Sequence, residues 1–160
     1  MEDRVKELLA RQEIANLVYE YCRALDQVDL EGVAGVFTED CEVEYGPDPK
    51  FNSHGTSQLM EHLRRMWRFS RTSHHPSGVQ IAFDGEDHAQ GTNSVIAWHE
   101  WPDGRQGTLW GMYFDRYVRT PKGWRIAHRR LEMRGNDPGF DSKINRFQRM
   151  PPPVGWKLEL

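Results

Sequence analysis

The chain has 160 residues, of which 28% are charged, and its acids and bases balance to a formal charge of −3. This length suits one domain with a sizeable core, and the mixed charges leave no basic stripe for a phosphate backbone, so we expect no nucleic acid partner. Two cysteines make no disulfide framework and no N-terminal apolar run predicts a signal peptide or membrane span, which favours a soluble cytoplasmic protein without a membrane partner.

The first predicted element is an amphipathic helix over residues 4–26. Its apolar residues recur at the three-and-four spacing of one helical face: Ile14, Leu17, Val18, Tyr21 and Leu25. At about 100° per residue, Asp26 falls beside this face, at a helix end where the dipole disfavours a negative charge. Asp26 is therefore a candidate functional residue. It could instead only begin the next turn, but Asp29 is the better N-cap for the following helix.

The remaining pattern predicts two more helices and then a sheet. A short helix is expected near 30–37, a brief strand at 41–45, and a third helix with Thr56 as its N-cap. Alternating apolar residues then predict four strands joined by tight turns, at 79–83, 89–101, 108–119 and 124–133. This order predicts an α+β fold, in which a curved antiparallel sheet wraps around the N-terminal helices and encloses a central pocket.

Residues 134–160 differ from the rest of the chain. They contain Asp-Pro-Gly at 137–139 and three prolines at 151–153, so we expect no regular element. Their apolar residues are too numerous for plain disorder: Phe140, Ile144, Phe147, Val154 and Trp156. We expect residues 1–133 to form the domain, and the tail to cover the pocket mouth or a subunit interface. Strands rich in aromatic residues on both faces also predict a homo-oligomer, either a dimer or a trimer.

Three segments within residues 5–133 carry a family resemblance. They are RQEIANLVYEYCRALDQVDLEGVAGVFTEDCEVEY, TSHHPSGVQIAFDGEDHAQGT and GMYFDRYVRTPKGWRIAHRRL. These segments resemble SnoaL-like proteins of the nuclear transport factor 2-like superfamily, which implies a cone-shaped α+β barrel. Because that superfamily includes dehydratases, dehydrochlorinases, isomerases, cyclases and non-catalytic members, the resemblance implies fold more than activity.

The resemblance also suggests site residues. Scytalone dehydratase and hexachlorocyclohexane dehydrochlorinase are similar to this chain in an aspartate ending the first helix and a histidine at the first long strand, which match Asp26 and His74. Both use that pair to remove a proton. The similarity to scytalone dehydratase extends to Tyr45 and His99 as further catalytic residues. The bile-acid dehydratase has a helix tyrosine before the aspartate, for which Tyr21 is the match.

One ambiguity concerns the adjacent histidines, which point to opposite sides of an extended strand. Alignment with the family pattern favours His74 as the partner of Asp26. Strand alternation through 79–83 would place His75 on the inner side, although a bulge at Pro76 would reverse that inference.

A histidine held by a carboxylate through one ring nitrogen keeps the other nitrogen as a general base. With Tyr45 protonating or orienting a leaving oxygen, this pair predicts a lyase that performs dehydratase-type elimination on a small apolar, aromatic or polycyclic substrate with an activated C–H bond. Such chemistry needs no cofactor, and no short ligand motif supports a metal. An isomerase, a polyketide-cyclase-type enzyme and a non-catalytic ligand-binding domain are the alternatives.

Other residues are expected at the substrate or in the framework. Five are predicted to contact the substrate: Tyr21, His75, Trp67, Trp110 and His128. The two tryptophans could equally belong to the core, as large aromatic residues in small domains often do. Asp115 with Arg129 or Arg130 is expected as a structural ion pair between strands.

Overall fold

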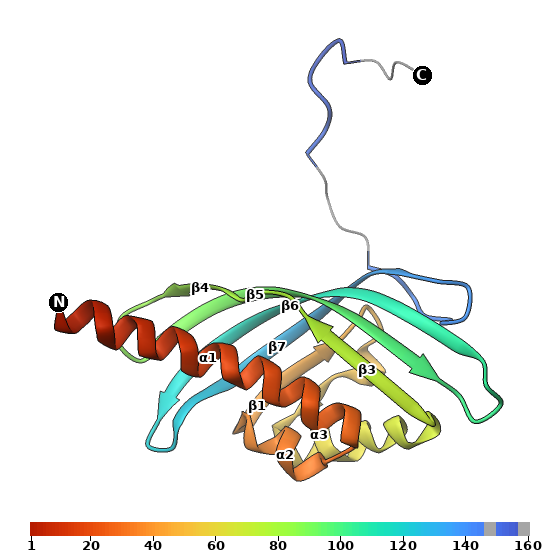
Figure 1. Ribbon diagram of the computed structural model, residues 1–160, viewed down its shortest axis with the longest axis horizontal. Coiled ribbons are helices and arrows are strands. Elements are labelled where there is room, and N and C mark those ends of the chain that lie inside the picture. Colours follow the sequence, from red (N-terminus) through yellow and green to blue (C-terminus); the bar gives the residue numbers. More distant parts are fainter. Residues whose placement is uncertain (146–149, 157–160) are drawn as a thin grey trace.

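A curved, unclosed sheet arches over a long N-terminal helix in the computed structural model (Figure 1), which describes residues 1–145 and 150–156. The elements follow in the order α1 (Glu2–Gln27), α2 (Leu30–Gly35), β1 (Phe37–Tyr45), η1 (Pro49–Phe51), β2 (Ser53–His54), α3 (Gly55–Leu63), η2 (Arg64–Arg68), β3 (Arg71–Pro76), β4 (Gln80–Phe83), β5 (His88–Glu100), β6 (Gln106–Thr120) and β7 (Gly123–Asn136). The predicted α+β class with a curved sheet is confirmed.

The strand order is β2-β1-β7-β6-β5-β3, and β4 pairs with β5 beside β3. Strands β5, β6 and β7 form the predicted antiparallel meander. The meander is antiparallel as predicted, but the whole sheet is mixed, because β1 pairs with β7 in parallel. This pairing joins segments far apart in the sequence, which local alternation cannot reveal. It brings Tyr45 beside Leu131 and so onto the sheet.

Helix α1 packs one face against the concave side of the sheet, as its apolar spacing predicts. It ends where Val28 takes a left-handed conformation with φ 54°, and the Asp29 amide donates to the Ala24 carbonyl at 2.9 Å. The Asp29 side chain then accepts from the Gly32 amide at 2.9 Å, so the expected N-cap of α2 is confirmed. These contacts fix the helix end that carries Asp26.

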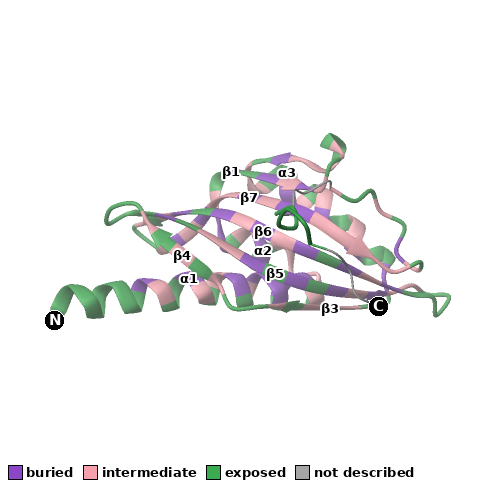
Figure 2. Ribbon diagram, turned by 90° about the horizontal axis from the view of Figure 1, so that it is seen from above, coloured by how far each residue is buried: buried purple, intermediate pink, exposed green. Residues whose placement is uncertain are grey.

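The core lies between the concave sheet face and the helices. Buried residues alternate with exposed or half-buried ones along the long strands β5 and β6, as Figure 2 shows. On the outer face, Ile96 and Trp110 are register partners and remain 46% and 43% exposed. No helix in the described part of the chain combines the length and apolarity needed to cross a membrane.

Several predicted boundaries move. Helix α3 begins at Gly55 after His54, whose backbone amide donates to Gln58 Oε1 at 2.7 Å, so the prediction of Thr56 as N-cap was wrong. Strands β3 and β4 are separate, because the chain leaves the sheet between Pro76 and Gln80. Alternation therefore does not run through from β4 to the histidines of β3.

The tail follows β7, which runs to Asn136 rather than residue 133. Phe140 is buried against the core, and Ile144 is 36% exposed. Val154 and Trp156 are exposed, so their expected packing on the pocket mouth does not occur within this chain. Phe147 lies outside the described residues.

Candidate active site

Two hydrogen bonds join Asp26 and His74 at the junction of α1 and β3, and a third ties Asp26 to Thr72. The His74 ring Nδ1 lies 2.6 Å from Asp26 Oδ1, and the His74 backbone amide donates to Oδ2 at 2.9 Å. The Thr72 hydroxyl also donates to Oδ1 at 2.8 Å. Both carboxylate oxygens are therefore occupied, and the carboxylate position is fixed by backbone as well as side chain.

Asp26 is held as a carboxylate. Partial burial opposes its ionisation, but the hydrogen bonds from His74 and Thr72 outweigh this effect, so its pKa lies below the ordinary value. An ionised Asp26 accepts a hydrogen from Nδ1 of His74, which leaves Nε2 as the nitrogen with a free electron pair. The His74 side chain is only 5% exposed, whereas that of Asp26 is 23% exposed.

The structure places His74, and not His75, against Asp26. His74 is the register partner of inward-facing Ala97, whereas His75 is opposite the exposed Ile96. The exposed His75 ring lies 2.8 Å from the Ser73 hydroxyl instead.

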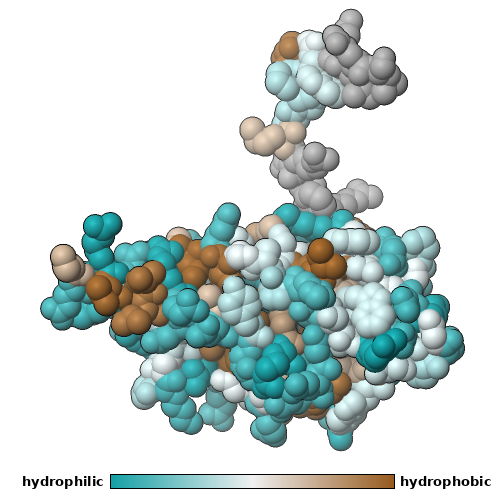
Figure 3. Space-filling model, viewed as in Figure 1, coloured by the Kyte–Doolittle hydropathy of each residue, from teal (hydrophilic) through white to brown (hydrophobic). Residues whose placement is uncertain are grey.

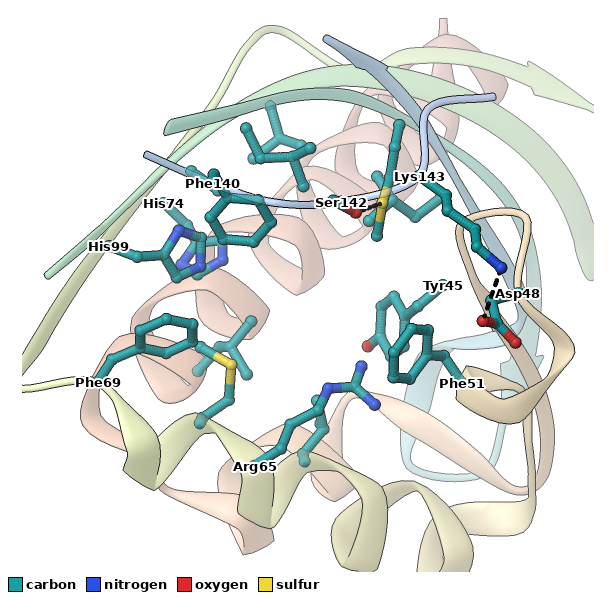
Figure 4. Close-up of a pocket in the computed structure, with 18 of the residues that line it drawn as sticks. Tyr45, Asp48, Phe51, Arg65, Phe69, His74, His99, Phe140, Ser142 and Lys143 are labelled. Atoms are coloured by element: carbon teal, nitrogen blue, oxygen red, sulfur yellow. Dashed lines mark hydrogen bonds and ion pairs between the residues drawn. The ribbon is translucent and has the colours of Figure 1, made fainter. Parts of the chain in front are cut away.

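A cavity of about 360 Å³ opens between the concave sheet face and the helices, and the His74 ring lines one side of it. Figure 4 shows the His74 and His99 rings together with Phe69 and Phe140, and Tyr45 with Phe51 across the cavity. Apolar side chains from β5, β6 and β7 complete the wall: Val95, Ala97, Leu109, Leu131 and Met133. This volume suits a small molecule of limited polarity.

Tyr21 and Tyr45 form a buried phenol pair in the cavity wall, with 2.6 Å between their hydroxyl oxygens. Burial raises the pKa of Tyr45 well above its usual range, and the same holds for Tyr21. Both phenols therefore stay protonated at neutral pH. One of the two hydroxyl hydrogens fills the shared hydrogen bond, and the other can be donated elsewhere.

His99 lies next to His74, with 5.5 Å between the ring centroids and nearly perpendicular planes. Its ring also packs against Phe69 at 4.5 Å and Phe140 at 4.7 Å. Burial, aided by the neighbouring His74, lowers the pKa of His99 to about 4, so the ring is neutral at pH 7. Its Nδ1 is buried with no hydrogen-bond partner in the described residues.

The four other predicted substrate contacts do not line this cavity among the described residues: His75, Trp67, Trp110 and His128. Trp67 and Trp110 are 58% and 43% exposed, because their positions on η2 and β6 turn them away from the concave face. The His128 Nε2 lies 2.9 Å from Glu44 Oε1, a hydrogen bond between β7 and β1. These four side chains thus lie outside the cavity, whereas Tyr21 lines it.

Arg65 was missed, because a regular helix would have placed it toward solvent with Arg64 and Arg68. The helix tightens into the 3-10 turn η2 from Arg64, which changes the angle between successive side chains. Arg65 then lines the cavity, and Arg68 joins it while remaining exposed. In the sequence, the only sign that Arg65 faces the cavity is that it lies close to the apolar residues Met66 and Phe69.

A second buried polar group supports the wall from behind. Arg129 donates two hydrogen bonds to Asp115, at 2.8 and 2.7 Å, and both side chains are fully buried. The guanidinium also stacks on Tyr21 and Tyr113, with 4.3 and 4.2 Å to the ring centroids. The expected structural ion pair thus involves Arg129 rather than Arg130, and it braces the tyrosine of the phenol pair.

The curved sheet, the helices beneath it and the cavity between them define a cone-shaped fold of the nuclear transport factor 2-like class. Within that class, the SnoaL-like domain model matches residues 6–130, so the chain belongs to the SnoaL-like family. An uncharacterized protein of Mycobacterium tuberculosis is 29% identical over 133 residues, which cover 78% of this chain and 86% of the relative.

Solved structures share the same fold. A candidate scytalone dehydratase from Novosphingobium aromaticivorans superposes with a TM-score of 0.82 at 29% identity, covering 98% of this chain and 99% of that one. The hexachlorocyclohexane dehydrochlorinase LinA-type3 from Novosphingobium barchaimii gives a TM-score of 0.75 at 16% identity, covering 93% and 99%. The family and its structural neighbours thus include proteins named for elimination reactions.

Proposed function

We propose that this protein is a lyase that performs a dehydratase-type elimination, with the Asp26–His74 pair as general base. The observation that carries the proposal is the 2.6 Å contact between Asp26 and Nδ1 of His74 at the edge of a cavity lined by both apolar and polar side chains. The likeness to a candidate scytalone dehydratase and to a dehydrochlorinase supports this class of reaction.

The geometry suits the following proton transfers. His74 Nε2 takes a proton from an activated carbon, and the electron pair of the broken C–H bond forms the new double bond. The leaving hydroxyl group departs with its bonding electrons and receives a proton from Tyr45, so that water is released. Asp26 stabilises the cationic His74 ring, and Tyr21 relays hydrogen bonding to Tyr45. Return of the His74 proton to Tyr45 through the released water restores both groups.

His99 is proposed as a neutral hydrogen-bonding residue next to the base. Its pKa of about 4 prevents it from competing with His74 for a proton at pH 7. General acid–base assistance of this kind contributes about 10² to 10⁴ in rate. The substrate must therefore already be activated, for example by a carbonyl group next to the C–H bond.

The test compares two variants on hydroxylated aromatic and polycyclic carbonyl compounds, with water loss followed by mass spectrometry. Asp26→Asn and His74→Ala should each lower turnover by about 10²-fold or more while ligand affinity changes little. His75→Ala is the matched control, because His75 is exposed and lies outside the cavity. Equal turnover in His74→Ala and His75→Ala would refute the proposal.

Other outcomes of this test would assign the protein a different function. Proton return to carbon without water loss would make the protein an isomerase, and ring closure would make it a cyclase. Ligand binding with no turnover of any substrate tested would favour a non-catalytic binding domain.

We also propose that copies of the chain associate as a dimer or trimer. Ile96 and Trp110 are exposed side by side on the outer sheet face, and apolar residues gather on the N-terminal end of α1 (Figure 3), where Val5, Leu8 and Leu9 are at least half exposed. The exposed apolar residues Val154 and Trp156 of the tail would find cover on a neighbouring copy. A cytoplasmic location remains a prediction.

A further inference from the structure

The cavity has a charge pattern that the proposed elimination does not use. Its lining carries four cationic side chains, Lys50, Arg65, Arg68 and Lys143, but only two carboxylates, Asp48 and Asp141. The chain as a whole has a formal charge of −3. The cavity therefore concentrates positive charge in a protein that is negative overall, which favours an anionic ligand.

The two lysines and the two arginines differ in how their charges are balanced. Lys50 and Lys143 both contact Asp48, at 3.2 and 3.5 Å. Neither Arg65 nor Arg68 has a carboxylate within 4 Å in the described part of the chain. Several other arginines of the chain do have an acidic partner within that distance. Arg65 and Arg68 of η2 are thus the two cavity cations without an acidic partner among the described residues, whereas the two lysines share Asp48.

Arg65 is the more enclosed of the two. Its guanidinium lies over the rings of Phe51 and Tyr45, with 4.8 and 5.3 Å to the centroids. Figure 4 shows it reaching from η2 into the cavity toward these two rings, away from the His74 and His99 side. Arg65 is half-buried, and this burial lowers the pKa of its guanidinium. The rings hold the guanidinium in place but supply no negative charge.

Arg68 adds a second guanidinium at the rim. It stacks on Phe69 at 4.6 Å, and Phe69 in turn packs against His99. Two like charges on one short turn repel each other, and a bound anion would relieve that repulsion while accepting planar hydrogen bonds from Arg65.

We infer that Arg65, with Arg68 at the rim, binds an anionic oxygen group of the ligand, such as a carboxylate, while the rest of the ligand extends across the apolar cavity toward His74. As the ligand is taken to be the substrate, this inference rests on the proposed function and narrows its substrate to an acidic aromatic or polycyclic compound. Arg65 is then a binding residue that sets which end of the ligand meets the base.

The test uses two probes of the same shape, 2-naphthoate and the neutral 2-naphthamide, with binding followed by quenching of tryptophan fluorescence and by calorimetry. Wild-type protein should bind the naphthoate about tenfold or more tightly than the naphthamide, as expected for a hydrogen-bonded charge pair. Arg65→Gln should abolish this preference and leave naphthamide affinity within about twofold.

Arg64→Gln is the matched control, because Arg64 is on the same turn but is exposed and paired with Glu61 at 3.0 Å. It should keep the preference. A wild-type protein that binds both probes equally, or neither at millimolar concentration, would overturn the inference even if Arg65→Gln failed to fold. So would an Arg65→Gln variant, folded by circular dichroism, that keeps the preference.

These outcomes separate the inference from the proposed function, because probe binding requires no turnover. Asp26→Asn should keep the naphthoate preference. An intact preference without any elimination activity would refute the lyase alone, and elimination without a preference would refute the anion site alone.

Discussion

Acid should destabilise this protein through His99. Its pKa is about 4 in the folded protein, against an ordinary value of 6.5, because the ring is buried beside His74 and Arg68 and between Phe69 and Phe140. Between these two pH values the unfolded chain binds a proton at His99 that the folded protein does not. The free energy of unfolding should therefore fall as pH falls, by about 1.4 kcal/mol per pH unit.

Over the whole interval, protonation of His99 in the unfolded chain should lower the free energy of unfolding by about 3 kcal/mol. This loss is complete near pH 4 and absent above about pH 7. Urea unfolding at half-unit steps from pH 4 to pH 7.5 measures this directly. His99→Gln removes the titrating group, so the difference between wild type and variant cancels the contribution of most carboxylates. Asp26 has a lowered pKa and also destabilises the fold in acid, but it is present in both proteins. Parallel pH profiles for wild type and His99→Gln would refute the argument.

Three further outcomes are expected. Arg129→Met should lower the free energy of unfolding by about 3 to 5 kcal/mol in urea titrations, because it leaves Asp115 buried without its counter-charge; a loss below 1 kcal/mol would contradict a structural role. Truncation after residue 136 should weaken 2-naphthoate binding, since Phe140 and its neighbours line the cavity, and unchanged affinity would remove the tail from the site. Ile96→Lys should lower the oligomeric mass in light scattering, whereas a wild-type monomer at micromolar concentration would refute association.

Elements of regular periodicity were predictable from the sequence. The amphipathic spacing of α1, the Asp29 cap and the alternation of β5 to β7 all reflect local chemistry, because each signal lies within a few residues. The candidate pair of Asp26 and His74 came from helix position and family resemblance together. The family alignment favoured His74 over His75, whereas strand alternation could not make that choice, since β3 and β4 are separate strands whose phases are independent.

The tertiary structure alone decided which side chains share the cavity. The parallel pairing of β1 with β7 brings Tyr45 to Tyr21, and the 3-10 turn at η2 rotates Arg65 inward while leaving Trp67 outside. The same pairing ties His128 to Glu44 on the far side of the sheet. Sequence spacing fixes the face of one element, but a cavity depends on how several elements cross, and those contacts join residues with no local relation in the chain.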